Sequence, residues 1–195
     1  ILDISDPTKP TLVRKHSEDF VIDDLFLMDN LIYMVGQGKP VEVSPNVFES
    51  KNNIRVLDIS NRTNPVLVGK YKKQMSLPRD IYIYNGIAYV VHLLPKDTLK
   101  ILDASDLTNL TLLGNYEFEI DNIRMVKGVY VFDKYAYVIS NKKLLILDIS
   151  DPTKPILIKT VDQNSLYTIS GIENYIYLIS FSPEGVPQFQ IFEIR

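Results

Sequence analysis

The sequence predicts an all-β protein, a β-propeller built of four-stranded antiparallel blades. The first reason is a short motif whose acidic residue recurs at positions 3, 58, 103, 148 and 193, in steps of 55, 45, 45 and 45 residues. The second is that each repeat holds short apolar segments joined by turn-forming residues, as in β-hairpins. The third is that no segment combines helical apolar spacing with capping residues. Repeats of about 40–45 residues that form four strands are typical of propeller blades.

The composition limits the partners of the chain. It has 195 residues, of which 46% are hydrophobic and 23% charged, so it can bury a core and is not a disordered tail. The net charge of -3 argues against nucleic acid and anionic membranes as main partners. Cysteine is absent, which excludes disulfides and thiolate metal sites. No apolar run approaches the roughly 20 residues that cross a bilayer. We therefore expect neither nucleic-acid binding nor membrane insertion.

The recurring motif is almost the same in every copy. Residues 2–10 read LDISDPTKP and return at 147–155, with variants at 57–65 and 102–110 and a degenerate last copy at 192–195. A carboxylate in every copy suggests either a calcium or acid–base site or a structural turn. We favour the turn, because an active site occurs once per protein and Asp side chains stabilise chain reversals by accepting backbone N–H bonds. The predicted turn residues are Asp3, Asp58, Asp103 and Asp148.

Each repeat predicts four short strands. The outer strand directly follows the motif, and these strands are expected at residues 11–13, 66–68, 111–113 and 156–158. Two apolar strands separated by two residues come next, and a further strand leads back to the motif. The two-strand hairpins are expected at residues 25–35, 81–91, 129–139 and 169–179. Their separators, such as Asn85-Gly86, tolerate positive φ and so close two-residue turns.

The strand count predicts how the blades are divided. We expect a half-blade at 1–18, complete blades at about 19–71, 72–117 and 118–160, and a partial blade at 161–195. The chain begins and ends on the same kind of strand, so a four-blade ring closed by strand exchange would leave one strand over. The sequence therefore predicts an arc of about four blades from a larger ring of about six to eight.

The repeated LDIS-D-P-T-x-P-x-L motif and the Y/A-Y-V strand resemble the LVIVD-repeat family of propellers over the whole chain. The resemblance implies a propeller like those of bacterial and archaeal surface or secreted proteins, so we expect an extracellular or cell-surface location. Two features depart from the pattern: Leu107 and Leu110 replace the prolines of the third copy, and the first blade carries a long insertion. The family has no single chemistry, so the resemblance implies a fold and not an activity.

Aromatic residues and histidines recur at defined places in the repeat. Tyr33, Tyr89, Tyr137 and Tyr177 share one position of the second strand, where an aromatic side chain is expected to pack between blades rather than form a ligand-stacking ladder. His92 ends such a strand just before a loop. It is a candidate contact residue beside the simpler interpretation of a structural or surface histidine, because metal catalysis needs several converging ligands.

Positions that differ between blades are the better candidates for function, because a repeated scaffold carries its function in variable loops. The residues just before the innermost strands are Asp23, Arg79, Lys127 and Tyr167. We expect them to point toward the mouth of the axial channel, where they would bind a small polar ligand or form only a solvated rim. The longest segment that does not follow the repeat pattern is the insertion at 37–53, in which Phe48 and Lys51 are candidate contact residues. We expect this insertion either to pack over the blade or to present a contact patch.

The sequence favours a non-enzymatic binding or scaffold module that contacts a protein or a small polar ligand through its loop face, with no cofactor and no metal. This face would comprise the loops at 37–53, 75–79, 92–97, 121–124 and 182–188. The alternative is a metal-dependent propeller hydrolase of lactonase type. Its parts would be Asp24, Asp80 and Asn122 at the starts of inner strands, completed by further blades. A third hypothesis is a module that only spaces other domains.

Overall fold

The computed structural model describes residues 1–17, 20–45, 47–50, 53–71, 75–118, 125–163 and 165–194. Every regular element in these ranges is a β-strand. The same ranges contain no helix long and apolar enough to cross a membrane.

Three four-stranded sheets, one three-stranded sheet and two hairpins make up the described chain, and all pairings are antiparallel. The first sheet holds β3 (Phe20–Met28), β4 (Leu31–Gly38), β7 (Asn53–Asp58) and β8 (Val66–Lys70). The second holds β9 (Ser76–Tyr84), β10 (Ile87–Leu94), β11 (Thr98–Asp103) and β12 (Thr111–Glu117). The third holds β13 (Gly128–Phe132), β14 (Tyr135–Ile139), β15 (Lys143–Asp148) and β16 (Ile156–Asp162). The fourth holds only β17 (Leu166–Ile172), β18 (Tyr175–Phe181) and β19 (Pro187–Glu193).

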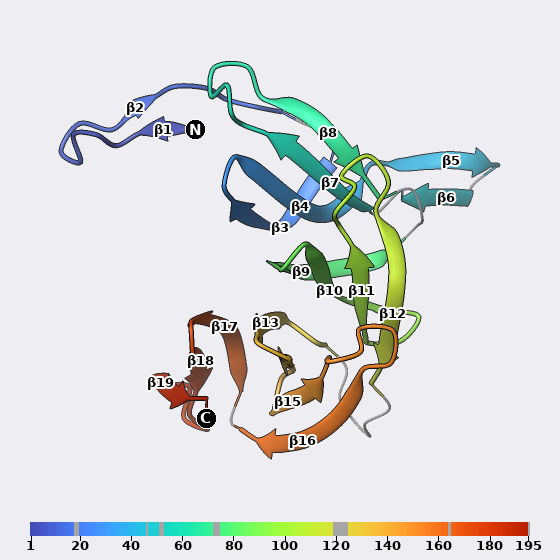
Figure 1. Ribbon diagram of the computed structural model, residues 1–195, viewed down its shortest axis with the longest axis vertical. Coiled ribbons are helices and arrows are strands. Elements are labelled where there is room, and N and C mark those ends of the chain that lie inside the picture. Colours follow the sequence, from blue (N-terminus) through green and yellow to red (C-terminus); the bar gives the residue numbers. More distant parts are fainter. Residues whose placement is uncertain are drawn as a thin grey trace.

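The four sheets are arranged radially, as blades of a propeller (Figure 1). Their first strands lie innermost and contact one another in chain order, β3 with β9, β9 with β13 and β13 with β17. The strands β8, β12 and β16 lie on the outside (Figure 1). The predicted all-β propeller is therefore confirmed, while the larger ring stays a prediction.

In the described chain, the strands of the first and last blades are not in close contact across the arc. The hairpin of β1 (Leu2–Asp3) and β2 (Thr11–Leu12) precedes the first blade, and in the described chain its strands pair only with each other. Figure 1 shows this hairpin and the sheet that ends in β19 at opposite ends of the arc, with an opening between them. Both end sheets therefore have one face without a neighbouring sheet.

Two-residue turns close the inner hairpins, as the sequence predicts. The first turn residue adopts a left-handed φ in every blade: 54° at Asp29, 50° at Asn85, 53° at Asp133 and 52° at Glu173. Asp and Asn accept this conformation more readily than other side chains. The turns fix the register of the strands, so Tyr33 lies opposite Phe26 and Tyr89 opposite Tyr82.

The core lies between the blades and not within them. Tyr33, Tyr89 and Tyr137 are 2%, 3% and 4% exposed, and each packs against aliphatic side chains of the next blade. Burial raises the pKa of Tyr89 and of Tyr137 to about 12. The predicted packing between blades is thus confirmed for these three tyrosines, whereas Tyr177 of the last blade is only partly buried and belongs to no junction core. Aromatic contacts also link the inner strands, from Phe26 to Tyr82 at 4.7 Å and from Tyr82 to Tyr130 at 5.1 Å between ring centroids.

Glycine is required where the turn of one blade packs on the outer strand of the blade before it. A Cβ atom on Gly114 in β12 would lie 2.4 Å from the carbonyl oxygen of Pro152, and one on Gly69 in β8 would lie 2.1 Å from that of Leu107. Both distances are far shorter than van der Waals contact. The corresponding position of β16 is Lys159, whose side chain is exposed.

The insertion in the first blade forms a hairpin of β5 (Pro40–Ser44) and β6 (Val47–Ser50). The prolines and polar residues of this segment interrupt the apolar pattern and predict a long loop. The segment forms strands despite this loop-like composition, because its backbone pairs Val41 with Glu49 and Glu42 with Phe48. The hairpin projects from the side of the first blade (Figure 1).

Candidate functional site

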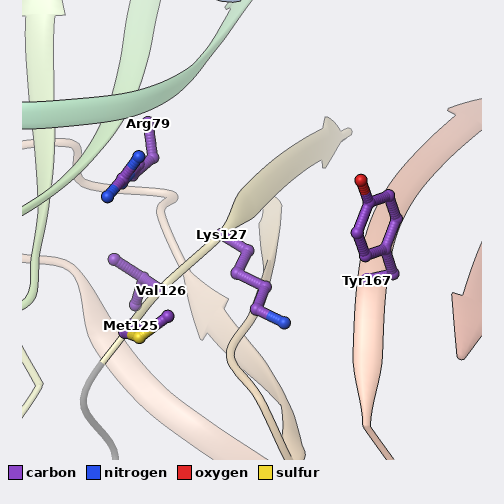
Figure 2. Close-up of a pocket in the computed structure, with 5 residues that line it drawn as sticks. All are labelled: Arg79, Met125, Val126, Lys127 and Tyr167. Carbon is purple, nitrogen blue, oxygen red and sulfur yellow. The ribbon is translucent and has the colours of Figure 1, made fainter. Parts of the chain in front are cut away.

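A hollow at the inner ends of the blades brings together three of the predicted rim residues. It is lined by Arg79, Met125, Val126, Lys127 and Tyr167 and has a volume of about 230 Å³ (Figure 2). Arg79 lies on β9, residues 125–127 lead into β13, and Tyr167 lies on β17. Three consecutive blades therefore contribute to one concave surface, because equivalent positions of a repeated blade face the same end of the axis.

The polar groups of the hollow differ in their exposure. Arg79 and Tyr167 are exposed, and Tyr167 packs edge-on against Phe181 at 6.0 Å between ring centroids. The Lys127 amino group donates a hydrogen bond of 2.6 Å to the Leu166 carbonyl oxygen, which holds its side chain across the third blade junction. Burial lowers the pKa of Lys127. In Figure 2 the Lys127 side chain lies between Arg79 and Tyr167, so the three reach the hollow from different sides.

Asp97 shapes the apolar wall of the hollow. Its Oδ2 atom accepts hydrogen bonds from the backbone N–H groups of Met125, at 2.6 Å, and Val126, at 3.1 Å. Met125 has a φ of 105°, a conformation that costs free energy in a residue with a side chain. Such strain persists only where the surroundings impose it, and here the buried carboxylate of Asp97 does so. Asp97 belongs to the predicted contact loop 92–97, but its support of Met125 and Val126 is not predicted, because a contact across 28 residues leaves no local pattern in the sequence.

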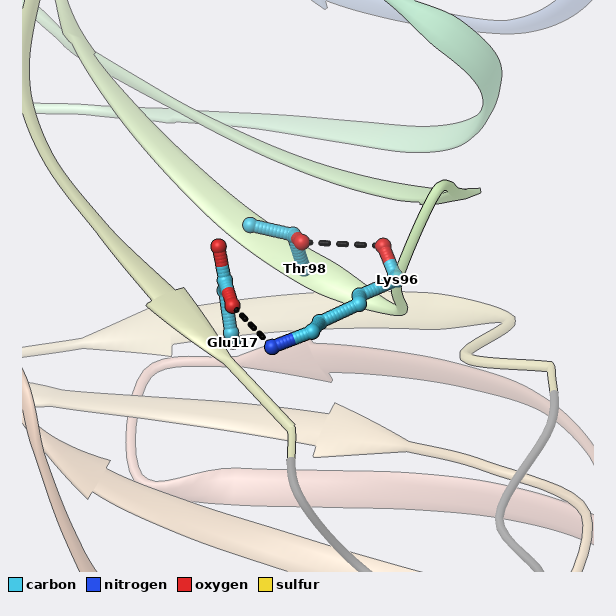
Figure 3. A network of polar contacts seen from close by, with 3 residues as sticks. All are labelled: Lys96, Thr98 and Glu117. Atoms are coloured by element: carbon cyan, nitrogen blue, oxygen red, sulfur yellow. Dashed lines mark hydrogen bonds and ion pairs between the residues drawn. The ribbon is translucent and has the colours of Figure 1, made fainter.

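The loop that carries Asp97 is held firmly on its blade. Lys96 and Glu117 form an ion pair of 2.8 Å, and the Thr98 hydroxyl donates to the Lys96 carbonyl oxygen at 2.9 Å (Figure 3). The Phe118 N–H donates to the Asp97 carbonyl oxygen at 2.9 Å. His92, a candidate contact residue, lies within β10 and is 4% exposed, so its side chain is beneath the surface. This loop acts as a fixed support for the hollow.

The remaining candidate residues lie elsewhere. Asp23 accepts a hydrogen bond of 3.1 Å from the Gln37 side chain and does not line the hollow. Phe48 belongs to β6, but its side chain falls outside the described part of the structure, as do Lys51 and the whole segment 121–124 with Asn122. The segment 182–188 comprises the turn between β18 and β19, where the Ser182 hydroxyl donates to Glu184 at 2.7 Å, and the first two residues of β19.

The repeated acidic residues stabilise the turns after the third strands. Each accepts a backbone N–H bond from the serine two residues later, at 2.9 Å in Asp3, 2.7 Å in Asp58, 2.8 Å in Asp103 and 2.9 Å in Asp148. Bonds from the same serine hold the pKa of each carboxyl below its ordinary value. These four carboxylates lie in four separate turns.

Asp24 and Asp80 form a carboxyl pair at the inner ends of the first two blades. Asp80 accepts N–H bonds from Ile81, at 2.8 Å, and from Val129 of the third blade, at 2.7 Å. Burial raises the pKa of Asp80 well above its usual value, and the hydrogen bond to Asp24 and the negative charge of Asp24 raise it further. The pair therefore favours a shared proton and joins β3, β9 and β13. Among the described side chains, no three of His, Asp or Glu are grouped closely enough to hold a metal ion.

We expect the Asp24→Asn variant to weaken the pH dependence of stability. Asp80 keeps its proton in the folded protein at pH values where the same residue in the unfolded chain has lost it. Its contribution to the free energy of unfolding is therefore full below about pH 3.8 and is lost as the pH rises through the raised pKa of the folded state. Asparagine removes the like charge and donates to Asp80. The free energy of unfolding at pH 7 should rise by about 1 kcal/mol. Urea denaturation between pH 4 and 8 measures this.

The matched control is Asp23→Asn, which removes the neighbouring exposed carboxylate and should leave the pH profile unchanged. A profile of Asp24→Asn that coincides with the wild-type profile would show that the pair does not share a proton.

The sequence model of the LVIVD repeat matches residues 1–17, 47–73, 78–117 and 123–163, which together are more than half of the chain. The chain belongs to the LVIVD repeat family. The segments matched in this LVIVD protein fall on the turns and strands of successive blades, and they leave out β3, β4 and β5 and the last sheet of β17, β18 and β19. A search of curated protein sequences finds no match.

Solved structures show the same fold as this LVIVD protein. The computationally designed Ika4 protein is 11% identical, with a TM-score of 0.61 over 92% of this chain and 95% of that one. The designed Ika8 protein is 10% identical, with a TM-score of 0.53 over 87% of this chain and 57% of that one. An alpha-L-arabinofuranosidase from Clostridium thermocellum is 11% identical, with a TM-score of 0.52 over 86% of this chain and 66% of that one. At these identities the likeness concerns the fold alone.

Proposed function

We propose that this LVIVD protein is a non-enzymatic binding module that holds the acidic group of a small polar ligand in the hollow at the mouth of its blades. The observation that carries the proposal is the convergence of Arg79, Lys127 and Tyr167 from three blades on one concave surface. Guanidinium and ammonium groups are strong donors to carboxylate and phosphate, and a phenol adds a neutral donor. No carboxylate is among the described residues that line the hollow.

The volume of the hollow and its apolar lining suit a small ligand. Its volume of about 230 Å³ lies just below the range of pockets for drug-sized molecules. Val126 is fully buried, and Met125 is held in its strained conformation by Asp97, so the apolar side of the hollow is formed before a ligand arrives. A preformed surface lowers the ordering cost of binding. We further propose that the module works on the cell surface or after secretion, which rests on its likeness to surface and secreted members of the family.

Citrate and inorganic phosphate are suitable probes for this site, with uncharged sucrose as the negative probe. At low ionic strength we expect citrate to bind the wild type and Arg79→Gln to weaken the binding about tenfold, because one charge-assisted hydrogen bond is worth about 1.5–3 kcal/mol. Tyr167→Phe should have a smaller effect. Isothermal titration calorimetry measures both affinities.

Lys159→Gln is the matched control, since it removes one exposed positive charge from the outermost strand of the third blade. An equal loss of citrate affinity in this control would show that only the overall charge matters. Absence of citrate and phosphate binding by the wild type would refute the proposed site.

The hydrolase alternative has one observation in its favour, the meeting of Asp24 and Asp80 at the inner strand ends. Both oxygens of Asp80 accept backbone N–H bonds, which is a bridging role between blades. Metal analysis of the purified protein separates the two functions: a stoichiometric ion lost in the Asp80→Asn variant would favour the enzyme over the binding module.

A further inference from the structure

In the described structure, the amino group of Lys127 meets a neutral acceptor and not a carboxylate. It lines the hollow and donates to the Leu166 carbonyl oxygen at 2.6 Å. A carboxylate beside an ammonium group strongly favours the charged form, whereas a backbone carbonyl oxygen does so less. The described lining of the hollow includes no such carboxylate. The surroundings of Lys127 therefore do little to keep a proton on its nitrogen.

Two further features favour the unprotonated amine of Lys127. The side chain is partly buried at the junction of the third and fourth blades, and this burial lowers its pKa. Arg79 contributes a second positive charge to the same hollow. Lysines that are desolvated or lie near another cation react with carbonyl compounds, because the free amine is the nucleophile. Lys127 thus has the surroundings of a nucleophilic lysine.

Two other lysines of the second and third blades are paired with carboxylates. Lys143 in β15 is also partly buried, but its amino group forms an ion pair of 2.9 Å with Asp162. Lys96 forms the ion pair of 2.8 Å with Glu117 (Figure 3). Partial burial alone therefore does not distinguish Lys127. Its neutral hydrogen-bond acceptor and the second cation of the hollow do.

The two cations of the hollow differ in how firmly they are held. The hydrogen bond to Leu166 holds the Lys127 amine at the side of β17, and a neutral amine that donates one N–H keeps its lone pair for another group. Arg79 is exposed, so its side chain can follow a ligand. In Figure 2 the two side chains reach the hollow from different sides. A ligand that contacts both therefore needs an acidic group at one end and an amine-reactive group at the other.

We propose that the hollow captures an acid that also carries an aldehyde or ketone group, with the acid on Arg79 and the carbonyl carbon bound to the Lys127 nitrogen as an imine. This inference rests on the proposed function and names the class of ligand. The amine lone pair attacks the carbonyl carbon, and the carbonyl oxygen gains a proton as the nitrogen loses one. The resulting carbinolamine expels its hydroxyl group as water, together with the remaining N–H proton, and the C=N bond forms. Addition of water reverses these steps and releases the ligand unchanged.

Reductive trapping measures the imine directly. The protein is treated with succinic semialdehyde, which has an aldehyde and a carboxylate at opposite ends, and with sodium cyanoborohydride, which reduces the imine to a stable secondary amine. Peptide mass spectrometry gives the rate at each lysine, and we expect Lys127 to be modified about tenfold faster than Lys143. Arg79→Gln should slow the reaction at Lys127 about tenfold and leave the rate at Lys143 unchanged, because the charge-assisted bond to the carboxylate is lost.

Butanal is the matched control, since it has the same carbon chain and aldehyde but no carboxylate. With butanal, Lys127 should lose most of its advantage over Lys143. Equal rates at the two lysines with succinic semialdehyde would overturn the proposal, and so would an advantage with butanal as large as with the acid. Citrate calorimetry separates the outcomes: citrate binding without preferential labelling removes the imine and keeps the proposed site, whereas loss of both removes the proposed function as well.

Discussion

Replacing Tyr137 by alanine should lower the free energy of unfolding by about 3–5 kcal/mol, as for other large aromatic side chains removed from a core. The ring is 4% exposed and lies in the core of the third junction, together with Leu166, Ile169 and Ile176 of the last blade. Its loss would leave a cavity in the apolar part of the contact between the two sheets. Urea denaturation followed by circular dichroism measures the change.

Tyr177→Ala is the matched comparison, because Tyr177 holds the same place in the repeat with no sheet against it. Its replacement by alanine should cost only about 1 kcal/mol. Equal losses at the two positions would show that the tyrosine stabilises its own sheet and not the junction. Tyr137→Phe should remain close to the wild type, since the ring fills the same space.

The Gly114→Ala variant should lose about 3 kcal/mol of stability, although it adds a single methyl group. That group would lie 2.4 Å from the Pro152 carbonyl oxygen and 2.9 Å from the Thr153 Cα atom. All the nearby atoms are backbone, so the turn at Pro152 and Thr153 must shift away from β12. Overpacking of this kind typically costs about 1–3 kcal/mol, and here it also loosens a contact between two blades.

Lys159→Ala serves as the control at the equivalent position of the third blade. Its side chain is exposed, so alanine should change the free energy of unfolding by less than about 0.5 kcal/mol. Thermal unfolding of the two variants beside the wild type gives both values in one experiment. A Gly114→Ala variant as stable as the wild type would mean that the turn of the third blade can adjust without cost.

The sequence predicts best the features that recur in several repeats. The 45-residue period gives the strands and turns of each blade, and the rim positions follow because equivalent residues face one end of the axis. Arg79, Lys127 and Tyr167 meet for that reason. The support from Asp97 of the second blade to Met125, which leads into the third, occurs once in the described chain and spans 28 residues, so no repetition reveals it. The hairpin of β5 and β6 also occurs once, and its backbone pairing prevails over a loop-like composition.

The inner strands contact one another in a row, from β3 through β9 and β13 to β17, and this arrangement determines where local unfolding begins. Each sheet is stabilised mainly by its two nearest neighbours, so local unfolding is cheapest where one neighbour is missing. The second and third sheets are flanked on both sides, and their backbone amides should exchange with solvent most slowly. Fraying then starts at the terminal sheets and moves inward, which leaves the middle pair as the most persistent part of the molecule.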